Sequence, residues 1–366
     1  MKVLVVTHDA TLSGAPRVAL LVTRILVEQG HDVRVLSRLP GPMLDQFAAL
    51  APTSVEPAHR WRNRLWRHAP RALALTIDAT LAAWTVLRAR ADLVYVNSTS
   101  AALYARVARW SRRPVVVLHG HESGENSDVF LRRAGLRRAG EGISLVACSP
   151  SVHRELAELL DLPMDEIVML PSVPDHAVVR QRAAEGPAPA YDDSLVVGCC
   201  GTAEPRKGVD LWETAATKVR ETLPDLDLRF VWVGASEVEQ SGPIEFIGAV
   251  QNPYPHLARF DLLVLPSRDD PFPLVVLESM LLGTPVVAFD VGAVREQVGD
   301  AGVMVPVEDT TALAEAVSGL LVDEGERRRL GEAAAVRATT RFSTEAFSVG
   351  LQRVVADLRQ VGRSAS

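Results

Sequence analysis

The 366-residue sequence contains little cysteine. Its three cysteines are Cys148 and the adjacent pair Cys199 and Cys200, which stand in an apolar run. Three thiols so placed cannot supply a disulfide framework or a spaced set of metal ligands. Their scarcity favours a reducing compartment, so we expect a cytoplasmic chain without structural disulfides.

Long apolar runs are also missing. Residues 1–7 read MKVLVVT and turn polar at His8 and Asp9, which is too short a stretch for a signal peptide. The longest nearly apolar stretch, Ala72 to Leu87, has 16 residues and contains Asp78, whereas a membrane span needs about 20. We therefore expect neither secretion nor a transmembrane helix.

A dinucleotide fingerprint is the third absence. The turn over residues 7–17 places Ser13 and Gly14 just before a helix expected at about Pro16, so it can present backbone N–H groups to an anion. The pattern G-x-G-x-x-G does not occur there, which argues against a nicotinamide dehydrogenase.

The composition is that of a folded soluble protein, with 48% hydrophobic and 23% charged residues, and the length allows two domains. The net charge of −6 is uneven: residues 1–183 hold 23 basic and 17 acidic residues, and the rest hold 16 and 28. The halves therefore carry +6 and −12. This asymmetry indicates either a first domain that faces an anionic partner or only random surface charge. No nucleic-acid partner is expected.

The first half alternates short β-branched runs with longer helical patterns. Predicted strands are 3–7, 32–37, 93–97, 115–118, 145–148 and 167–170, and predicted helices are 16–29, 100–111 and 151–160. The strand runs are almost continuously apolar, as expected for parallel strands covered by helices on both faces. This pattern predicts a doubly wound α/β domain.

A stretch rich in proline, alanine and glycine then interrupts the pattern, and residues 183–193 are the best candidate for a linker. Beyond it, predicted strands begin at 195, 227, 244, 262, 285 and 302, and helices cover 209–222, 273–282, 310–322 and 345–360. We expect Rossmann-like domains at 1–182 and 194–344 that face a cleft. A C-terminal helix and tail, 345–366, should return toward the first domain.

Two segments of the second half carry chemistry. The sequence GCCGTAEPRKG, ending at Gly208, places Arg206 and Lys207 where a phosphate chain would meet a helix N-terminus, although they could also be solvated surface bases. In residues 266–288, a loop with Asp269 and Asp270 precedes a helix that displays Glu278 among leucines. A carboxylate at this position is costly to bury unless it accepts hydrogen bonds. Sugar hydroxyls are suitable donors for it. The alternative is that Glu278 is an ordinary surface glutamate.

Together these segments resemble the retaining GT-B glycosyltransferases of family 4. The stretch from Asp270 is similar to their E-x-F-G-x-x-x-x-E motif and to the A-x-x-x-G-x-P-V-V-A-like helix and strand that follow it. The resemblance covers most of the chain: the opening strand and its loop, Leu118-His119, residues 206–208, 246–250 and 266–288, and Gly292 to Glu296. It implies a transferase of carbohydrate or glycoconjugate biosynthesis, with a nucleoside-diphosphate sugar as donor and no cofactor.

The resemblance also implies roles for single residues. Glu278 would bind the donor ribose, Lys207 and Arg206 its diphosphate, and the backbone of Val250 its base. Gly14 would let the first loop approach the sugar phosphate, and His119 would contact the transferred sugar. The other positions implied in donor binding are Thr202, Pro271, Phe272 and Leu274.

Two departures from the family pattern are visible. The first acid of the motif is Asp270, one methylene shorter than glutamate, so its contact with the sugar 3- and 4-hydroxyls is altered or water-mediated. The usual arginine of the glycine-rich turn is missing, and Gly201 or Thr202 takes its place. The sequence therefore does not determine the identity of the donor sugar, nor which residue replaces the missing arginine as a charge partner of the diphosphate.

The implied mechanism retains the anomeric configuration, because the acceptor attacks on the face from which the nucleoside diphosphate leaves. The residues implied in this step are His119, Arg206, Lys207 and Asp270, and the leaving oxygen takes the acceptor proton. No Asp-x-Asp ends a strand, so a catalytic metal is not expected. A GT-B nucleotide-sugar 2-epimerase and a non-catalytic nucleotide-sugar-binding protein remain alternatives.

The acceptor side has one candidate segment. Residues 60–71 gather five arginines and two tryptophans, a combination that suits an anionic membrane interface. We expect peripheral contact with the inner face of the membrane and a lipid-linked acceptor. The alternatives are a glycoside or small-molecule acceptor, and a covering helix whose tryptophans pack on the sheet.

Overall fold

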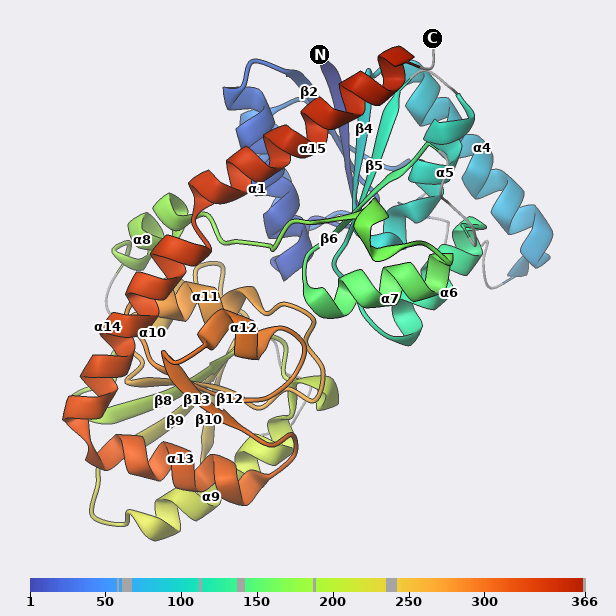
Figure 1. Ribbon diagram of the computed structural model, residues 1–366. Coiled ribbons are helices and arrows are strands. Elements are labelled where there is room, and N and C mark those ends of the chain that lie inside the picture. Colours follow the sequence, from blue (N-terminus) through green and yellow to red (C-terminus); the bar gives the residue numbers. More distant parts are fainter. Residues whose placement is uncertain are drawn as a thin grey trace. The chain divides into compact units, whose positions relative to one another are not determined.

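The computed structural model of the protein describes residues 1–57, 59–60, 68–111, 114–136, 142–186, 189–234 and 242–364 (Figure 1). The chain forms two compact units. The first consists of Met1–Ser172 and Phe347–Ser366, and the second of Val173–Ala346.

The first unit is built on a parallel seven-stranded sheet with the order β3-β2-β1-β4-β5-β6-β7. Its strands are β1 (Lys2–Thr7), β2 (Asp32–Ser37), β3 (Thr53–Val55), β4 (Leu93–Asn97), β5 (Val115–Gly120), β6 (Ser144–Ala147) and β7 (Ile167–Met169). The central strands are buried along their length, which explains their continuous apolar runs. The strand order reverses between β1 and β4, and such a reversal is where doubly wound sheets bind ligands.

Helices connect these strands. They are α1 (Gly14–Glu28), α2 (Leu44–Leu50), α4 (Arg71–Ala89), α5 (Ala102–Trp110), α6 (Glu125–Ala134) and α7 (Pro150–Leu160), with 3-10 turns η1 (Thr99–Ala101) and η2 (Met164–Glu166). The start of α7 shows why a helix begins there: the Ser149 hydroxyl accepts a hydrogen bond from the Val152 N–H at 3.2 Å, and Pro150 occupies the first turn.

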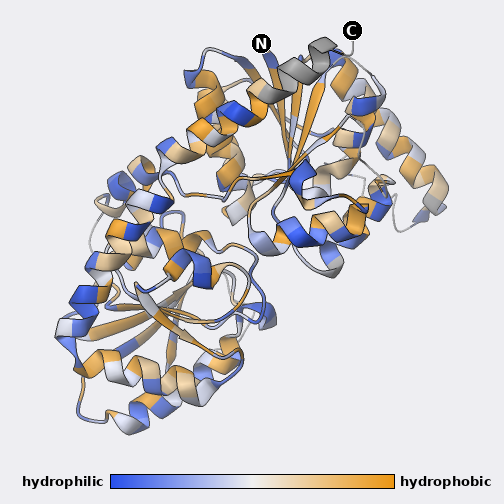
Figure 2. Cartoon of the chain, in the orientation of Figure 1, coloured by the Kyte–Doolittle hydropathy of each residue, from blue (hydrophilic) through white to orange (hydrophobic). Residues whose placement is uncertain are grey.

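The second unit has a parallel six-stranded sheet with the order β10-β9-β8-β11-β12-β13. Its strands are β8 (Leu195–Cys200), β9 (Leu228–Val233), β10 (Ile244–Gly248), β11 (Leu262–Leu265), β12 (Val286–Phe289) and β13 (Gly302–Val305). Figure 2 shows the strands of both sheets as predominantly hydrophobic. The order reverses between β8 and β11, so the loops after these two strands meet at one edge.

The helices of the second unit include the segments predicted from the sequence. They are α8 (His176–Ala183), α9 (Val209–Thr222), α10 (Tyr254–Leu257), α11 (Leu274–Leu281), α12 (Val294–Val298), α13 (Thr310–Val322) and α14 (Glu324–Arg341), with a 3-10 turn η3 (Pro205–Lys207). The doubly wound architecture of both halves is confirmed.

The structure divides the chain ten residues before the predicted boundary at 182, since the second unit begins at Val173. Helix α8 packs on α10 and α11, and Arg182 donates to the Gln251 carbonyl at 3.0 Å. The segment 183–193 expected as a linker therefore lies inside the second unit. The final helix, α15 (Thr344–Ser364), enters the first unit at Phe347, as the expected return of the C-terminal helix requires.

Helix α4 is longer than the apolar stretch seen in the sequence. The window Ala72–Ala89 has 18 residues with a mean hydropathy of 1.3, and 22% of it is buried. Among the described residues this is the one helix long and apolar enough to cross a membrane, by length and composition alone. The expectation of no such helix rested on 16 residues, and the structure adds one further turn.

Candidate functional site

The turn after β8 is shaped by glycines. At Gly208, φ is +72°, and a Cβ there would lie 1.8 Å from the Pro266 carbonyl oxygen, so only glycine allows this close approach. Gly201 has φ of +139°, and its carbonyl accepts a hydrogen bond from the Trp232 indole at 2.8 Å. The loop after β11 is thereby held against the start of α9.

Lys207 and Asp270 form an ion pair at this edge. The Lys207 ammonium donates to the Asp270 carboxylate, and both side chains are largely buried. The backbone around Asp270 is also fixed, because a Cβ on Gly292 would lie 2.0 Å from the Asp270 carbonyl oxygen. The expected diphosphate-binding cation and the expected sugar-binding acid are therefore in direct contact.

Arg206 points along the same loop. Its guanidinium donates to the Asp269 carbonyl at 3.0 Å and to Glu204 at 2.8 Å, and its side chain is exposed. Thr202 is exposed as well, whereas Phe272 and Leu274 are buried and Pro271 is intermediate. The Arg206 side chain thus holds the acidic loop by bonding to the backbone of Asp269. The exposed guanidinium can also be reached from solvent.

Arg268 was missed in the sequence analysis and joins the two halves of this edge. It donates to both carboxylate oxygens of Asp210 at 2.8 and 2.7 Å, to Glu308 at 2.6 Å and to the Pro205 carbonyl at 2.7 Å. These bonds from Arg268 lower the pKa of Asp210. Its place in the Pro266–Asp270 loop was the one sequence feature that pointed to Arg268. The contacts themselves could not be predicted from it, because the acidic partners lie 58 and 40 residues away in the sequence.

Glu278 is buried in α11 and accepts a hydrogen bond from the Tyr254 hydroxyl at 3.1 Å. Tyr254 is buried too, and the guanidinium carbon of Arg182 lies 6.0 Å from its ring centroid. Val250 is partly exposed in the loop that follows β10. The carboxylate among apolar residues therefore has a donor in the protein, as its burial requires.

His119 in the first unit is the next-to-last residue of β5 and is fully buried. Its Nδ1 lies 2.7 Å from the Tyr95 hydroxyl, which is the donor because burial raises the pKa of Tyr95. Burial lowers the pKa of His119 well below its usual value, with the neighbouring His121 acting in the same direction. The imidazole of His119 is thus neutral and packed within the sheet.

His121 lies two residues further and is partly exposed. Its Nε2 lies 3.0 Å from Asn97 Oδ1, and its Nδ1 lies 3.3 Å from the Ser172 hydroxyl. Asn97 donates through Nδ2 to the Ala15 carbonyl at 2.8 Å, so its Oδ1 accepts and His121 carries its proton on Nε2. Burial lowers the pKa of His121 to about 4, against the opposing charge of Glu122.

Glu122 ties the ends of β4 and β5 together. It accepts hydrogen bonds from the Ser98 hydroxyl and from the N–H and hydroxyl of Thr99 at 2.9 and 2.7 Å. Burial raises its pKa, but the charge of His121 and these hydrogen bonds outweigh that effect and lower it overall. Ser98 has φ of +101°, a strained conformation that this network holds in place.

The loop before α1 reaches the same edge of the first sheet. Gly14 is exposed at the first position of α1, and no side chain caps the helix start at Ser13. The imidazole of His8 lies 3.3 Å from the carboxylate of Asp9 in this loop. His121 and Glu122 were missed here, although the run Leu118-His-Gly-His-Glu122 was a visible signal.

The predicted site residues fall into two groups. Gly14 and His119 belong to the first unit, and all the others belong to the second, where Lys207, Arg206 and Asp270 share one edge. The arginines at 62, 64 and 67 of the expected membrane segment lie outside the described residues. No group of three or more metal-binding side chains occurs within the described ranges.

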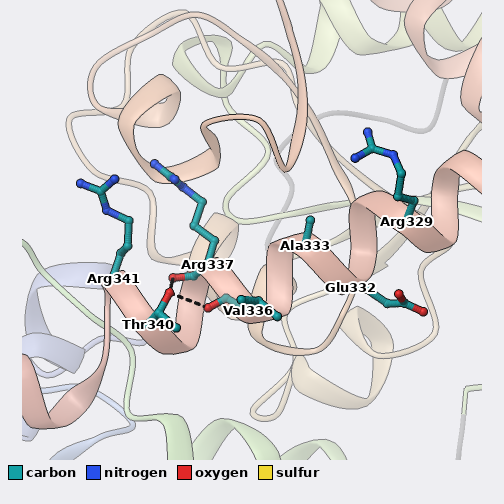
Figure 3. A pocket seen from close by; sticks show the side chains of 7 residues that line it. All are labelled: Arg329, Glu332, Ala333, Val336, Arg337, Thr340 and Arg341. Atoms are coloured by element: carbon teal, nitrogen blue, oxygen red, sulfur yellow. Dashed lines mark hydrogen bonds between the residues drawn. The ribbon is translucent and has the colours of Figure 1, made fainter.

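A hollow of about 460 Å³ lies elsewhere, over α14, and Figure 3 shows its seven lining side chains on that one helix. Arg337 projects from this helix to donate to the Gln297 and Glu296 carbonyls at 2.7 and 2.6 Å, and Arg329 pairs with Glu326. None of the predicted site residues lines it. Arg337 thereby links α14 to α12, whereas the Arg329 pair lies within α14.

Two parallel sheets, each with functional side chains at the edge where its strand order reverses, define the GT-B fold. The model described as "Glycosyltransferase Family 4" matches residues 12–177, and that described as "Glycosyl transferases group 1" matches residues 194–323. The chain belongs to glycosyltransferase family 4 and is a retaining transferase that uses a nucleotide-sugar donor. The epimerase and non-catalytic alternatives are thereby set aside.

Known proteins resemble the chain over most of its length. Glycogen synthase of Mycobacterium tuberculosis is 28% identical over 97% of this chain and 94% of its own. D-inositol 3-phosphate glycosyltransferase of Paenarthrobacter aurescens is 29% identical over 64% of this chain and 61% of its own. The crystal structure of Anabaena HepE with UDP and glucose has a TM-score of 0.77 at 20% identity and covers 97% of this chain and 99% of its own.

Proposed function

We propose that the protein transfers a sugar from a uridine-diphosphate sugar to an acceptor hydroxyl at the cytoplasmic face of a membrane. The observation that carries the donor side is the Lys207–Asp270 ion pair at the start of α9. The uridine base is supported by Anabaena HepE, which has been crystallised with UDP and with UDP-glucose.

The ion pair suggests how donor binding prepares the site. A diphosphate carries more negative charge than one carboxylate, so it displaces Asp270 from the Lys207 ammonium. The released carboxylate then accepts hydrogen bonds from the sugar hydroxyls, while Arg206 supports the diphosphate. In the transition state, Lys207 and Arg206 stabilise the charge that grows on the departing diphosphate, whose oxygen takes the acceptor proton.

Other residues orient the two substrates. Glu278 and the loop at Val250 are proposed to hold the ribose and the base, since both follow strands of the same parallel sheet, β11 and β10, on the side where Lys207 follows β8. In the first unit, the strand end that carries His119 is the proposed sugar contact. Because the His119 side chain is fully buried, the partly exposed His121 beside it is proposed to meet the sugar, and Glu122 fixes the shape of this strand end. The acceptor is a lipid-linked compound, a glycoside or a small molecule.

Calorimetry with UDP, GDP and ADP tests the donor base. We expect UDP to bind most tightly, and tighter binding of GDP or ADP contradicts the uridine assignment. Incubation with a panel of UDP-sugars, followed by NMR of the released sugar, tests the reaction. Slow hydrolysis with retained anomeric configuration supports the proposal, and binding without turnover under any acceptor condition contradicts it.

The segment 60–71 is proposed, on its sequence, to contact the membrane. Each basic residue near an anionic surface contributes ~1 kcal/mol, so three arginines give measurable, salt-sensitive vesicle binding. Co-sedimentation should therefore weaken when Arg62, Arg64 and Arg67 are changed to serine. Binding that ignores these substitutions contradicts the contact proposed for residues 60–71.

A further inference from the structure

Helix α4 exposes a row of apolar side chains along one face. Leu73, Trp84 and Leu87 are 50%, 52% and 60% exposed, and Thr76 and Thr80 continue the row at helical spacing. The opposite face buries Ala74, Asp78, Ala82 and Val86, one every fourth residue, and the helix packs on α5. The outer face of α4 therefore has no partner within the described residues (Figures 1 and 2).

Arginines accompany the exposed tryptophans. The guanidinium carbon of Arg88 lies 5.0 Å from the Trp84 ring centroid, and that of Arg106 lies 4.7 Å from the centroid of Trp110, which ends α5 and is 64% exposed. Both helices lead into parallel strands, so their C-terminal ends lie at the same edge of the first sheet. Two indole–guanidinium pairs are thus grouped on the α4 and α5 side of this unit.

Acidic side chains are scarce on this surface. Residues 68–111 contain five arginines but only Asp78 and Asp92 as acids. Asp78 is buried, and Asp92 accepts a hydrogen bond from the Lys2 backbone N–H at 2.8 Å. The accessible charge next to the apolar row is therefore positive.

We propose that the outer face of α4, together with Trp110, docks on an anionic lipid bilayer with the helix lying in the plane of the interface. Indole and guanidinium groups suit this depth, because the ring sits among the headgroups while the cation meets the phosphates. A spanning helix would have to take the buried Asp78 away from the protein and into hydrocarbon.

The proposal concerns membrane binding and uses neither the donor nor the acceptor of the proposed reaction. It also differs from the contact proposed for residues 60–71, because its residues are apolar and aromatic and lie on described helices. Binding measured without substrate therefore separates it from the catalytic proposal.

The test is co-sedimentation of the full chain with phosphatidylglycerol-containing and pure phosphatidylcholine vesicles. We expect binding to the anionic vesicles and at least a tenfold weaker partition for the double variant Trp84→Ser, Leu87→Ser. The matched control is Val336→Ser, which removes a 62% exposed apolar side chain from α14. It should bind as the unaltered chain does, and circular dichroism should show that both variants are folded.

Further variants and measurements distinguish docking on a bilayer from contact with a second copy and from a membrane span. Arg88→Ser with Arg106→Ser should reduce the salt sensitivity of binding and leave the apolar contribution in place. The proposal is overturned if the unaltered chain ignores anionic vesicles, or if only the changes at Arg62, Arg64 and Arg67 affect binding. Self-association that the Trp84, Leu87 variant abolishes would assign the face to a second copy, and resistance to alkaline carbonate extraction would indicate a span; both contradict an interfacial helix.

Discussion

At the scale of single residues, the chemistry of this transferase depends on where a few charges are held. Lys207 is one of three lysines in the chain, and its ammonium already lies against a carboxylate before any ligand arrives. The neutral imidazole of His121 and the carboxylate of Glu122 form a second polar pair, fixed by hydrogen bonds to the neighbouring strand end.

Lys207→Ala should weaken UDP binding by about 1.5–3 kcal/mol, because a charge-assisted contact to phosphate is lost. Isothermal titration calorimetry measures this change. Lys218→Ala is the matched control, since Lys218 lies on α9 and donates to the hydroxyls of Thr310 and Thr311 instead. Equal affinities of the Lys207 variant and the unaltered chain would remove Lys207 from the donor site.

Glu122→Gln should destabilise the first unit by about 1–3 kcal/mol at pH 7, because the amide cannot replace the charge that accepts from Ser98 and Thr99. The pKa of Glu122 is lowered in the folded state, so its contribution is fully present above the unfolded pKa of 4.5 and is lost as the pH falls from there through the lowered folded pKa. Urea unfolding at pH 7 and pH 3.5 should show the difference shrinking. A difference that persists at pH 3.5 speaks against a charge effect.

His121 should make the first unit sensitive to mild acid. Its pKa is lowered to about 4, below the usual 6.5, so the unfolded chain binds the proton first and stability falls as the pH drops from 6.5 to 4. With allowance for partial exposure, the loss is on the order of 2 kcal/mol. His121→Gln should flatten this part of the pH profile in urea titrations, and an unchanged profile would contradict the assignment.

At the scale of elements, the donor edge depends on the contact between the η3 turn and the loop after β11. Gly208 approaches Pro266 too closely for any side chain, and Arg268 closes the same contact from the other direction. The η3 turn and the loop after β11 therefore form one continuous surface. Together they fix the position of the start of α9.

Gly208→Ala should lower the stability of the second unit by more than about 2 kcal/mol and weaken UDP binding, since the new Cβ must push the Pro266 carbonyl away. Gly283→Ala is the matched control. It has a similar φ of +81° but nothing within 4 Å of a new Cβ, so it should cost only the backbone strain. Chemical denaturation and calorimetry of both variants make the comparison, and equal effects would show that the contact with Pro266 is unimportant.

At the scale of the whole molecule, two doubly wound units carry separate sets of polar side chains. The second unit holds the cations proposed to meet the diphosphate, and the first holds the histidine and carboxylate cluster. If Lys207 and Arg206 neutralise the diphosphate as proposed, transfer should survive treatment with EDTA. Activity lost with EDTA and restored by magnesium would contradict this expectation.

Much of the fold followed from local patterns in the sequence. Continuous apolar runs such as residues 93–96 and 262–265 lie in strands, because burial on both faces of the sheet favours apolar side chains throughout. The motif from Asp270 to Glu278 also identified the family, because its spacing on a loop and a helix is a local property. The short strand Thr53–Val55 and helix α6 were missed, since short or polar segments show little periodicity.

Only the tertiary structure decided which side chains meet. Arg268 contacts acids that are distant in the sequence, and Asn97 orients His121 from a neighbouring strand. It also decided that His119 is buried while His121 is partly exposed, and that α4 leaves tryptophan and leucine uncovered. The physical reason is that periodicity is written into neighbouring residues, whereas burial and pairing arise only when distant segments pack together.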